Sequence, residues 1–293
     1  MPEPVFRAGP CAVALETTLL VHGVPASSAP GLHRELRSIC RDEGAEPALV
    51  GLVSGRPTVG VSEDELALLL EQGTSVPKAN SANLGVLCHW GSHGATTVSA
   101  TMELASGAGV HVFSTGGLGG VHKGYGCHLD ISADLGAFTR FPVAVVASGV
   151  KSLLDVASTR EALETLGVPV IGYRTDAFPA FYTRDSGQQV DARFDDAETL
   201  AAYLRYELDR TGRGVLVCNP IPENDELDPD AFAGWLERAE DEAEDRGVTG
   251  RGVTPFLLAR LHELSGGKTL EANLALVRSN VRLGARLAKA MHG

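Results

Sequence analysis

Apolar runs of strand length alternate along the chain with amphipathic stretches of helix length. Residues 12–21 are apolar except for Glu16 and two threonines, which predicts a first strand with Glu16 in its interior. Further strands are predicted around the turn 54–57 within residues 47–61, and then at 110–114, 143–147, 168–172 and 214–222. Helices are predicted at 30–44, from 62, at 96–105, from about 151, from 158, and at 200–208, 230–246 and 270–291. This alternation is typical of an α/β layered fold.

Local signals at the ends of these segments support the pattern. Pro30 stands at the start of one predicted helix and Gly44 at its end. Ser62, followed three residues later by Glu65, predicts a capping box, and Ser158 is the predicted cap of a later helix. The sequence contains no internal repeat and no low-complexity linker, so we predict one domain over residues 1–293.

Composition limits the classes of function. The net charge of −12 argues against a nucleic-acid partner, because phosphate backbones are bound by basic surfaces. Five cysteines without a CxxC pair predict reduced thiols, and no apolar run is long enough to span a bilayer. The basic residues and apolar run of a signal peptide are also missing from the start of the sequence. We therefore expect a soluble, cytoplasmic protein that acts on small molecules.

A glycine-rich loop follows the predicted strand 110–114. Thr115 is followed by Gly116, Gly117, Leu118, Gly119 and Gly120. Such glycines can adopt positive φ and bring backbone N–H groups close to an anion. Close packing of a tight loop against a helix explains the same residues equally well.

Two carboxylates stand four residues apart just beyond this loop. If Asp130 and Asp134 lay on one helix face, with Ser132 between them, their oxygens would suit a hard cation such as Mg²⁺ or Mn²⁺. A helix cap at Asp130 or Ser132 is the alternative. The histidines form no HxH or HExxH motif, which argues against a zinc site.

Lys151 and Glu16 are the candidates for covalent and acid–base chemistry. Lys151 follows the strand 143–147 and a Ser-Gly turn, at the end of a strand where α/β sheets bind ligands. Surrounded by apolar residues, a lysine there can supply the free amine that attacks a sugar C1′ and forms an imine, although a surface lysine at a helix start fits the same pattern. Glu16, within an apolar strand, is either paired or a general acid/base. Lys78 is a candidate partner for a phosphate or carboxylate.

Several short motifs occur in one order from about residue 14 to near the C-terminus. They are Ala14-Leu15-Glu16-Thr17-Thr18, His22-Gly23-Val24-Pro25, 94–98, 115–122, 130–134, Gly149-Val150-Lys151-Ser152, 168–173, 219–222 and 253–257. In these motifs the chain resembles the pseudouridine-5′-phosphate glycosidases, also called indigoidine synthase A-like proteins. The resemblance implies a three-layer α/β/α sandwich with a central mixed sheet, and a homotrimer.

The resemblance also implies roles for single residues. Lys151 would be the nucleophile that opens the ribose as a Schiff base, Glu16 the proton donor and Asp130 the ligand of Mn²⁺ or Mg²⁺. The implied substrate contacts are Lys78, Val98, Thr115, His122, Ser132, Ala133, Asp134 and Asn273, the last of them toward the base.

This sequence departs from the family in two stretches. Residues 80–84 lack the Ser-Arg-Arg-Asp of typical members, and residues 122–126 read His-Lys-Gly-Tyr-Gly. We interpret the loss of charged groups as a changed acceptor pocket, with His89, Trp90 and His93 as candidates for its wall; packing of a helix end is the alternative reading of these three.

The resulting hypothesis is a C-glycosynthase that joins ribose 5-phosphate to an aromatic aglycone, as in alnumycin-type antibiotic biosynthesis. The alternative is reversible cleavage of pseudouridine 5′-phosphate to uracil and ribose 5-phosphate. A ribokinase-like phosphotransferase and a catalytically silent sugar-phosphate binding protein are rivals from other classes. Both would tolerate replacement of Lys151, which the lysine mechanism would not.

Overall fold

The computed structural model describes residues 3–9, 11–124, 126, 129–248 and 253–293, with only the backbone of 254 and 255. Among these residues, nine strands form one sheet in the order β1-β4-β3-β2-β7-β8-β11-β9-β10. The strands are β1 (Val5–Phe6), β2 (Ala12–Glu16), β3 (Glu46–Val53), β4 (Arg56–Val59), β7 (Val112–Ser114), β8 (Ala144–Ala147), β9 (Val170–Tyr173), β10 (Ala192–Phe194) and β11 (Val215–Cys218). Only the β3–β4 pair is antiparallel, so the sheet is mixed, as predicted. A separate two-stranded sheet joins β5 (Lys78–Ala79) to β6 (Ala95–Thr96).

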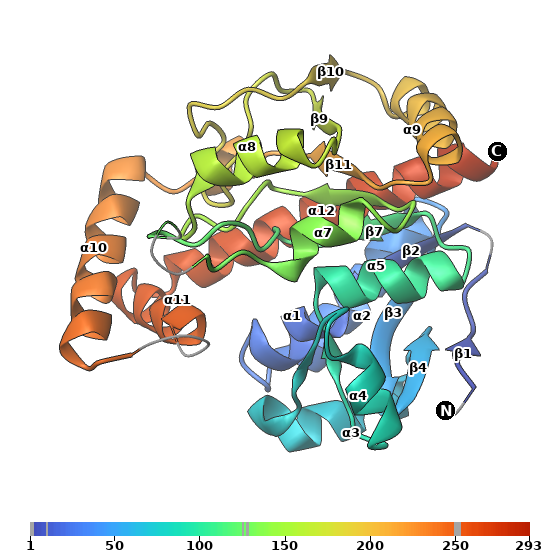
Figure 1. The fold of residues 1–293 in the computed structure, drawn as a ribbon, viewed down its shortest axis with the longest axis horizontal. Coiled ribbons are helices and arrows are strands. Elements are labelled where there is room, and N and C mark those ends of the chain that lie inside the picture. Colours follow the sequence, from blue (N-terminus) through green and yellow to red (C-terminus); the bar gives the residue numbers. More distant parts are fainter. Residues whose placement is uncertain (1–2, 10, 125, 127–128, 249–252) are drawn as a thin grey trace.

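Helices cover both faces of this sheet. They are α1 (Thr17–His22), α2 (Ala29–Asp42), α3 (Glu63–Gln72), α4 (Leu84–His89), α5 (Val98–Gly107), α7 (Ala133–Phe138), α8 (Val156–Thr165), α9 (Ala197–Thr211), α10 (Pro229–Asp245), α11 (Val253–Leu264) and α12 (Lys268–His292). Helix α12 packs on β2, β7 and β8 and against α2 and α9, whereas α5 packs on β2 and β3 and against α7. Figure 1 shows α5, α7 and α8 in front of the sheet and α12 behind it. The predicted α/β/α sandwich is therefore confirmed.

The central strands are apolar on both faces because both faces are covered. Every residue of β8, β9 and β11 is buried, and the fully buried side chains include Phe113, Phe138 and Phe178. Within the described part of the chain, no helix has both the length and the apolar character needed to cross a bilayer.

The predicted strand 12–21 is wrong in its second half. Strand β2 ends at Glu16, and α1 begins at Thr17. The hydroxyl of Thr17 accepts a hydrogen bond from the backbone N–H of Thr96 (2.8 Å), which holds the first turn of this helix. A short apolar run has no periodicity that distinguishes a strand from a buried helix, so the pattern did not reveal the break.

The helix predicted from about Lys151 is also wrong. Lys151 lies in a loop, and α8 begins at Val156 with Asp155, not Ser158, as its cap. The carboxylate of Asp155 accepts a hydrogen bond from the backbone N–H of Ser158 (2.9 Å). Ser158 is therefore not the cap itself; it lies three residues after the capping residue Asp155 and donates the capping hydrogen bond. The capping box of Ser62 and Glu65, by contrast, is confirmed.

Candidate active site

Three candidate residues stand where neighbouring parallel strands end. Glu16 is the last residue of β2, Thr115 directly follows β7, and Lys151 lies four residues beyond the end of β8. The chain leaves β2 toward β3 on one side, while β7 leads to β8 on the other. This is a topological switch point, where the carboxyl ends of strands leave a crevice in open α/β sheets.

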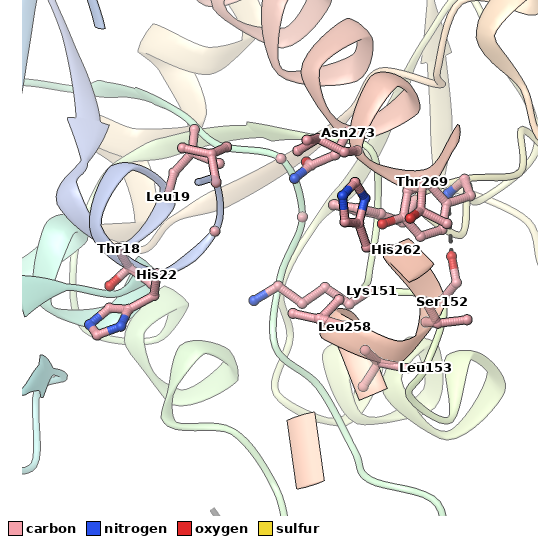
Figure 2. Close-up of a pocket in the computed structure, with 18 of the residues that line it drawn as sticks. Thr18, Leu19, His22, Lys151, Ser152, Leu153, Leu258, His262, Thr269 and Asn273 are labelled. Atoms are coloured by element: carbon pink, nitrogen blue, oxygen red, sulfur yellow. Dashed lines mark hydrogen bonds between the residues drawn. The ribbon is translucent and has the colours of Figure 1, made fainter. Parts of the chain in front are cut away.

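A cavity of about 400 Å³ occupies this edge of the sheet. It brings together five of the predicted site residues: Glu16, Lys78, Thr115, Lys151 and Asn273. Its remaining lining comes from α1 and the loop after it, from the glycine loop, from residues 152, 153, 181, 182 and 232, and from α11 and α12. Figure 2 shows the Lys151 side chain extending into the cavity toward α1, with Asn273 and His262 on another wall.

The surroundings of Glu16 change the proton affinity of its carboxyl group. Its Oε1 accepts a hydrogen bond from the hydroxyl of Thr115. Burial raises the pKa of Glu16, and the negative charge of Asp134 adds to this, while Lys151, the Thr115 hydrogen bond and Lys78 oppose it. The net direction is upward, which favours a protonated carboxyl at a higher pH than is usual for glutamate and suits a general acid.

The backbone around Lys151 is fixed by a glycine and by the neighbouring loop. Gly149 has φ of +71°, and a Cβ there would lie 1.8 Å from the carbonyl oxygen of Pro179, so no other residue fits. The N–H of Lys151 donates to the carbonyl of Leu118 (3.1 Å), and the N–H of Leu118 donates to the carbonyl of Gly149 (3.0 Å). These bonds fix the direction in which the Lys151 side chain leaves the backbone.

Lys78 places a second amine in the cavity wall. Burial of its side chain lowers the pKa of Lys78, and the neighbouring charge of Lys151 lowers it further, while Glu16 acts in the opposite direction. Two amines and one carboxyl in one concave site suit a substrate that carries negative charge, such as a phosphate ester.

The glycines of the glycine loop are not explained by positive φ. None of Gly116, Gly117, Gly119 and Gly120 has positive φ, so that prediction is wrong. A Cβ on Gly117 would lie 2.5 Å from the Phe181 ring, and one on Gly119 or Gly120 would lie 2.4 Å from a neighbouring side-chain oxygen. Close packing is therefore what requires glycine here.

Asp134 joins the glycine loop to two helices. It is buried near the start of α7, and its carboxylate oxygens accept hydrogen bonds from the N–H groups of Gly119 (2.9 Å) and Ser99 (3.1 Å). Ser132 caps α7 by accepting from the N–H of Asp134 (3.2 Å), which confirms the cap alternative. Ala133 is the exposed first residue of α7, and Val98 is the buried first residue of α5. Their roles as substrate contacts stay predictions.

We expect Asp134→Ala to destabilise the protein strongly. The N–H groups of Ser99 and Gly119 would lose their acceptor, and orphaned buried groups cost about 1–3 kcal/mol each, so the free energy of unfolding should fall by roughly 2–5 kcal/mol. Urea denaturation measures the change. Asp130→Ala, which removes an exposed carboxylate nearby, is the matched control, with an expected change within about 0.5 kcal/mol. Equal effects of the two variants would contradict the bracing role of Asp134.

The proposed metal ligand is separate from Asp134. Asp130 precedes α7 and its side chain is 57% exposed, so the predicted shared helix face of Asp130 and Asp134 is wrong. His122 Nδ1 lies 3.8 Å from a carboxylate oxygen of Asp130, and His122 lines a neighbouring cavity of about 350 Å³. Within the described residues no three acidic, histidine or cysteine side chains gather as a metal site. The accessible oxygens of Asp130 fit a Mg²⁺- or Mn²⁺-type ion that takes one protein carboxylate and completes its shell with water or substrate.

The predicted acceptor wall is wrong. His89, Trp90 and His93 do not line the cavity around Lys151. Trp90, which follows α4, is 70% exposed, and His93 Nδ1 accepts a hydrogen bond from the N–H of Ser54 (3.2 Å). These residues lie at the end of α4 and in the segment after it, which agrees with the alternative that they pack a helix end. Tyr125, in the second altered stretch, lies outside the described residues.

Two residues of this region had no role in the sequence analysis. His22 lines the cavity with its Nε2 buried and without a hydrogen-bond partner among the described residues, and burial lowers its pKa. Asn280, fully buried in α12, donates to the carbonyl oxygen of Thr115 (2.8 Å) and to the hydroxyl of Ser148 (3.1 Å). His22 belonged to a quoted motif and could have been found, whereas nothing near Asn280 in the sequence marks it.

The switch-point cavity, with its carboxyl group and two amines, defines an α/β enzyme with its site at the carboxyl edge of the sheet. Residues 4–290 match the family model described as indigoidine synthase A like protein, so the chain belongs to the indigoidine synthase A-like family.

Relatives and solved structures agree with this assignment. A pseudouridine-5′-phosphate glycosidase of Methylobacterium nodulans is 47% identical over 290 residues, which cover 98% of this chain and 85% of the relative. One of Geobacillus kaustophilus is 46% identical over 281 residues, covering 94% and 92%. The crystal structure of an indigoidine synthase A-like protein from Thermotoga maritima matches with a TM-score of 0.89 and 38% identity, over 97% of this chain and 94% of that one. The prealnumycin C-glycosynthase in complex with ribulose 5-phosphate matches with a TM-score of 0.88 and 34% identity, over 96% and 91%.

Proposed function

We propose that the chain cleaves the C–C glycosidic bond of pseudouridine 5′-phosphate and releases uracil and ribose 5-phosphate. The observation that carries this proposal is that the Lys151 amine and the Glu16 carboxyl line one cavity at the switch point. The names of relatives that are 44–47% identical over nearly the whole chain support the same substrate.

The proposed chemistry starts with the Lys151 amine. Its Nζ forms a bond to C1′ as the bond from C1′ to the ring oxygen breaks and that oxygen takes up a proton. The nitrogen lone pair then forms the C1′=N imine while the C–C bond breaks, and Glu16 gives its proton to the departing ring carbon. Water hydrolyses the imine, which frees ribose 5-phosphate and restores the amine. A carbon leaving group needs this push from the nitrogen lone pair, because it carries no basic atom of its own that could be protonated.

The other residues of the site bind and orient. Lys78 is proposed to pair with the negative charge of the substrate, and Asn273 to meet the base. Asp130 would hold Mn²⁺ or Mg²⁺, which supplies positive charge that neutralises the phosphosugar. We also propose a homotrimer, on the strength of the family resemblance.

Synthesis of an aromatic C-glycoside is the second candidate. Its support is the structural match to the prealnumycin C-glycosynthase and the apolar wall of Phe181, Tyr182 and Phe232 in the cavity. The argument from residues 80–93 no longer favours it, because the altered residues tested above lie outside the cavity. The comparisons therefore favour cleavage of pseudouridine 5′-phosphate.

A product assay separates the two candidates. The purified chain is incubated with pseudouridine 5′-phosphate and a divalent cation, and uracil is measured by chromatography. We expect stoichiometric release of uracil and ribose 5-phosphate. In parallel, ribose 5-phosphate is offered together with uracil or with a dihydroxynaphthalene. Coupling to the naphthalene with no release of uracil would refute the proposal and favour the synthase.

A further inference from the structure

Another pocket lies at the same edge of the sheet, where β9 and β11 end. Its volume is about 260 Å³. Its charged lining consists of four arginines: Arg174, Arg184, Arg282 and Arg286. Arg174 directly follows β9, and Arg282 and Arg286 come from α12, so elements far apart in the sequence contribute to it. Within the part of the chain that the structure describes, no carboxylate is among its lining residues.

The carboxylates near these arginines lie outside the pocket lining. Glu43 is shared between Arg286, at 3.0 Å, and Arg282, at 3.6 Å. Glu223 lies 3.5 Å from Arg184 and its side chain is 82% exposed, so this pair is weak. Two further glutamates lie near these arginines: Glu226 accepts a hydrogen bond from the backbone N–H of Arg184 (2.8 Å), and the negative charge of Glu198 reaches Arg286. Among the described lining residues, however, the four guanidinium groups are the only charged side chains, although the whole chain carries a net charge of −12.

Arg174 and Arg184 are anchored by backbone carbonyls. Arg174 donates to the carbonyl of Asp195 (3.0 Å), and its guanidinium lies over the ring of Tyr173. Arg184 donates to the carbonyl of Ile221. Such bonds orient these two guanidinium groups without neutralising them, which lowers the entropy cost of ordering them when a ligand binds.

The floor of the pocket is polar and ordered. Asn219, the first residue of the motif 219–222, is buried and donates to Ser279 Oγ (3.0 Å) and to Asn280 Oδ1 (2.9 Å). Asn280 in turn donates to the carbonyl of Thr115, in the wall of the catalytic cavity. The proposed function uses neither Asn219 nor the arginines, so the motif has a role still to be explained.

We propose that this pocket is a second anion site, which binds a small phosphate-bearing molecule. Guanidinium groups bind phosphate oxygens through paired hydrogen bonds, and several converging arginines in a concave pocket suit a phosphate better than a carboxylate or a neutral ligand. The pocket is too small for a protein segment to be its natural occupant. This inference does not depend on which C-glycoside the catalytic cavity accepts.

The test is binding of inorganic pyrophosphate to the full-length chain, measured by isothermal titration calorimetry in the presence of EDTA. We expect Arg282→Gln to weaken one binding event at least about tenfold, since a charge-assisted hydrogen bond contributes roughly 1.5–3 kcal/mol. The matched control is Arg278→Gln, one turn earlier on α12. Arg278 pairs with Glu35 of α2 (2.7 Å), much as Arg282 pairs with Glu43 just after α2, but it lies outside the pocket. It should bind pyrophosphate as the unaltered chain does.

Two further variants keep the test decisive. Ser279→Asp adds a carboxylate to the pocket and should abolish the same binding event even if Arg282→Gln folds poorly. Lys78→Gln, in the catalytic cavity, should leave it unchanged. The proposal is overturned if no pyrophosphate binds, or if only Lys78→Gln weakens binding. It is also overturned if Arg282→Gln alters the mass of the assembly in light scattering without affecting pyrophosphate, which would make the pocket a contact between copies.

Discussion

Replacement of Lys151 by alanine should abolish turnover of pseudouridine 5′-phosphate while leaving the protein folded. The amine is the group that attacks C1′ of the substrate and opens the ribose, so its removal eliminates the covalent path and does not merely slow it. We expect a loss of kcat on the order of 10⁴-fold or more, as for other essential nucleophiles. Lys151 lies in a loop and is half-buried, so the melting temperature should change little.

Chemical trapping gives the same prediction a direct readout. Borohydride added during turnover, or with ribose 5-phosphate alone, should reduce the imine and fix a phosphopentose on Lys151, detected by intact mass and peptide mapping. Lys289→Ala, which removes an exposed lysine on α12, is the control and should be trapped as the unaltered chain is. A normal rate for Lys151→Ala, or an adduct on Lys78 in its place, would refute the assigned nucleophile.

The catalytic end of the sheet was predictable because strand ends carry positional information. Lys151 and Thr115 each follow an apolar run, and parallel strands end at one edge, so their meeting follows from the pattern. Glu16 was recognised as chemically unusual because it interrupts an apolar run, although its place at the end of β2 was missed. Six helical residues with the composition of a strand hid that boundary.

Other parts of the site could not be derived from local pattern. Lys78 and Asn273 reach the cavity from a two-residue strand and from the last helix, and only the family resemblance connected them with Glu16. The role of Asn280 depends on contacts with residues more than 130 positions away. Loss of charge at residues 80–84 suggested a changed acceptor pocket, yet the neighbouring Trp90 proved exposed, because composition does not report which cavity a residue faces.

Glu16→Gln should have two opposite effects, one on activity and one on stability. Glutamine cannot donate the proton that the departing carbon needs, so kcat should fall about 10²–10⁴-fold, the usual contribution of a general acid. The free energy of unfolding should rise relative to the unaltered chain at alkaline pH. Burial raises the pKa of Glu16 above its ordinary value of 4.5. As pH rises, Glu16 therefore ionises at a lower pH in the unfolded chain than in the folded protein. The unaltered protein therefore loses stability as pH rises from that value through the raised pKa, and glutamine removes this loss.

The pH profile identifies Glu16 as the group that must be protonated. For the unaltered enzyme, kcat/KM should fall as pH rises through the pKa of Glu16, and the residual activity of Glu16→Gln should lack that descending limb. Thr115→Val is the diagnostic partner. The Thr115 hydrogen bond lowers the pKa of Glu16, so its removal should move the limb to higher pH while leaving the carboxyl in place. If the descending limb of the kcat/KM profile is not shifted in Thr115→Val and is still present in Glu16→Gln, the titrating acid is another residue.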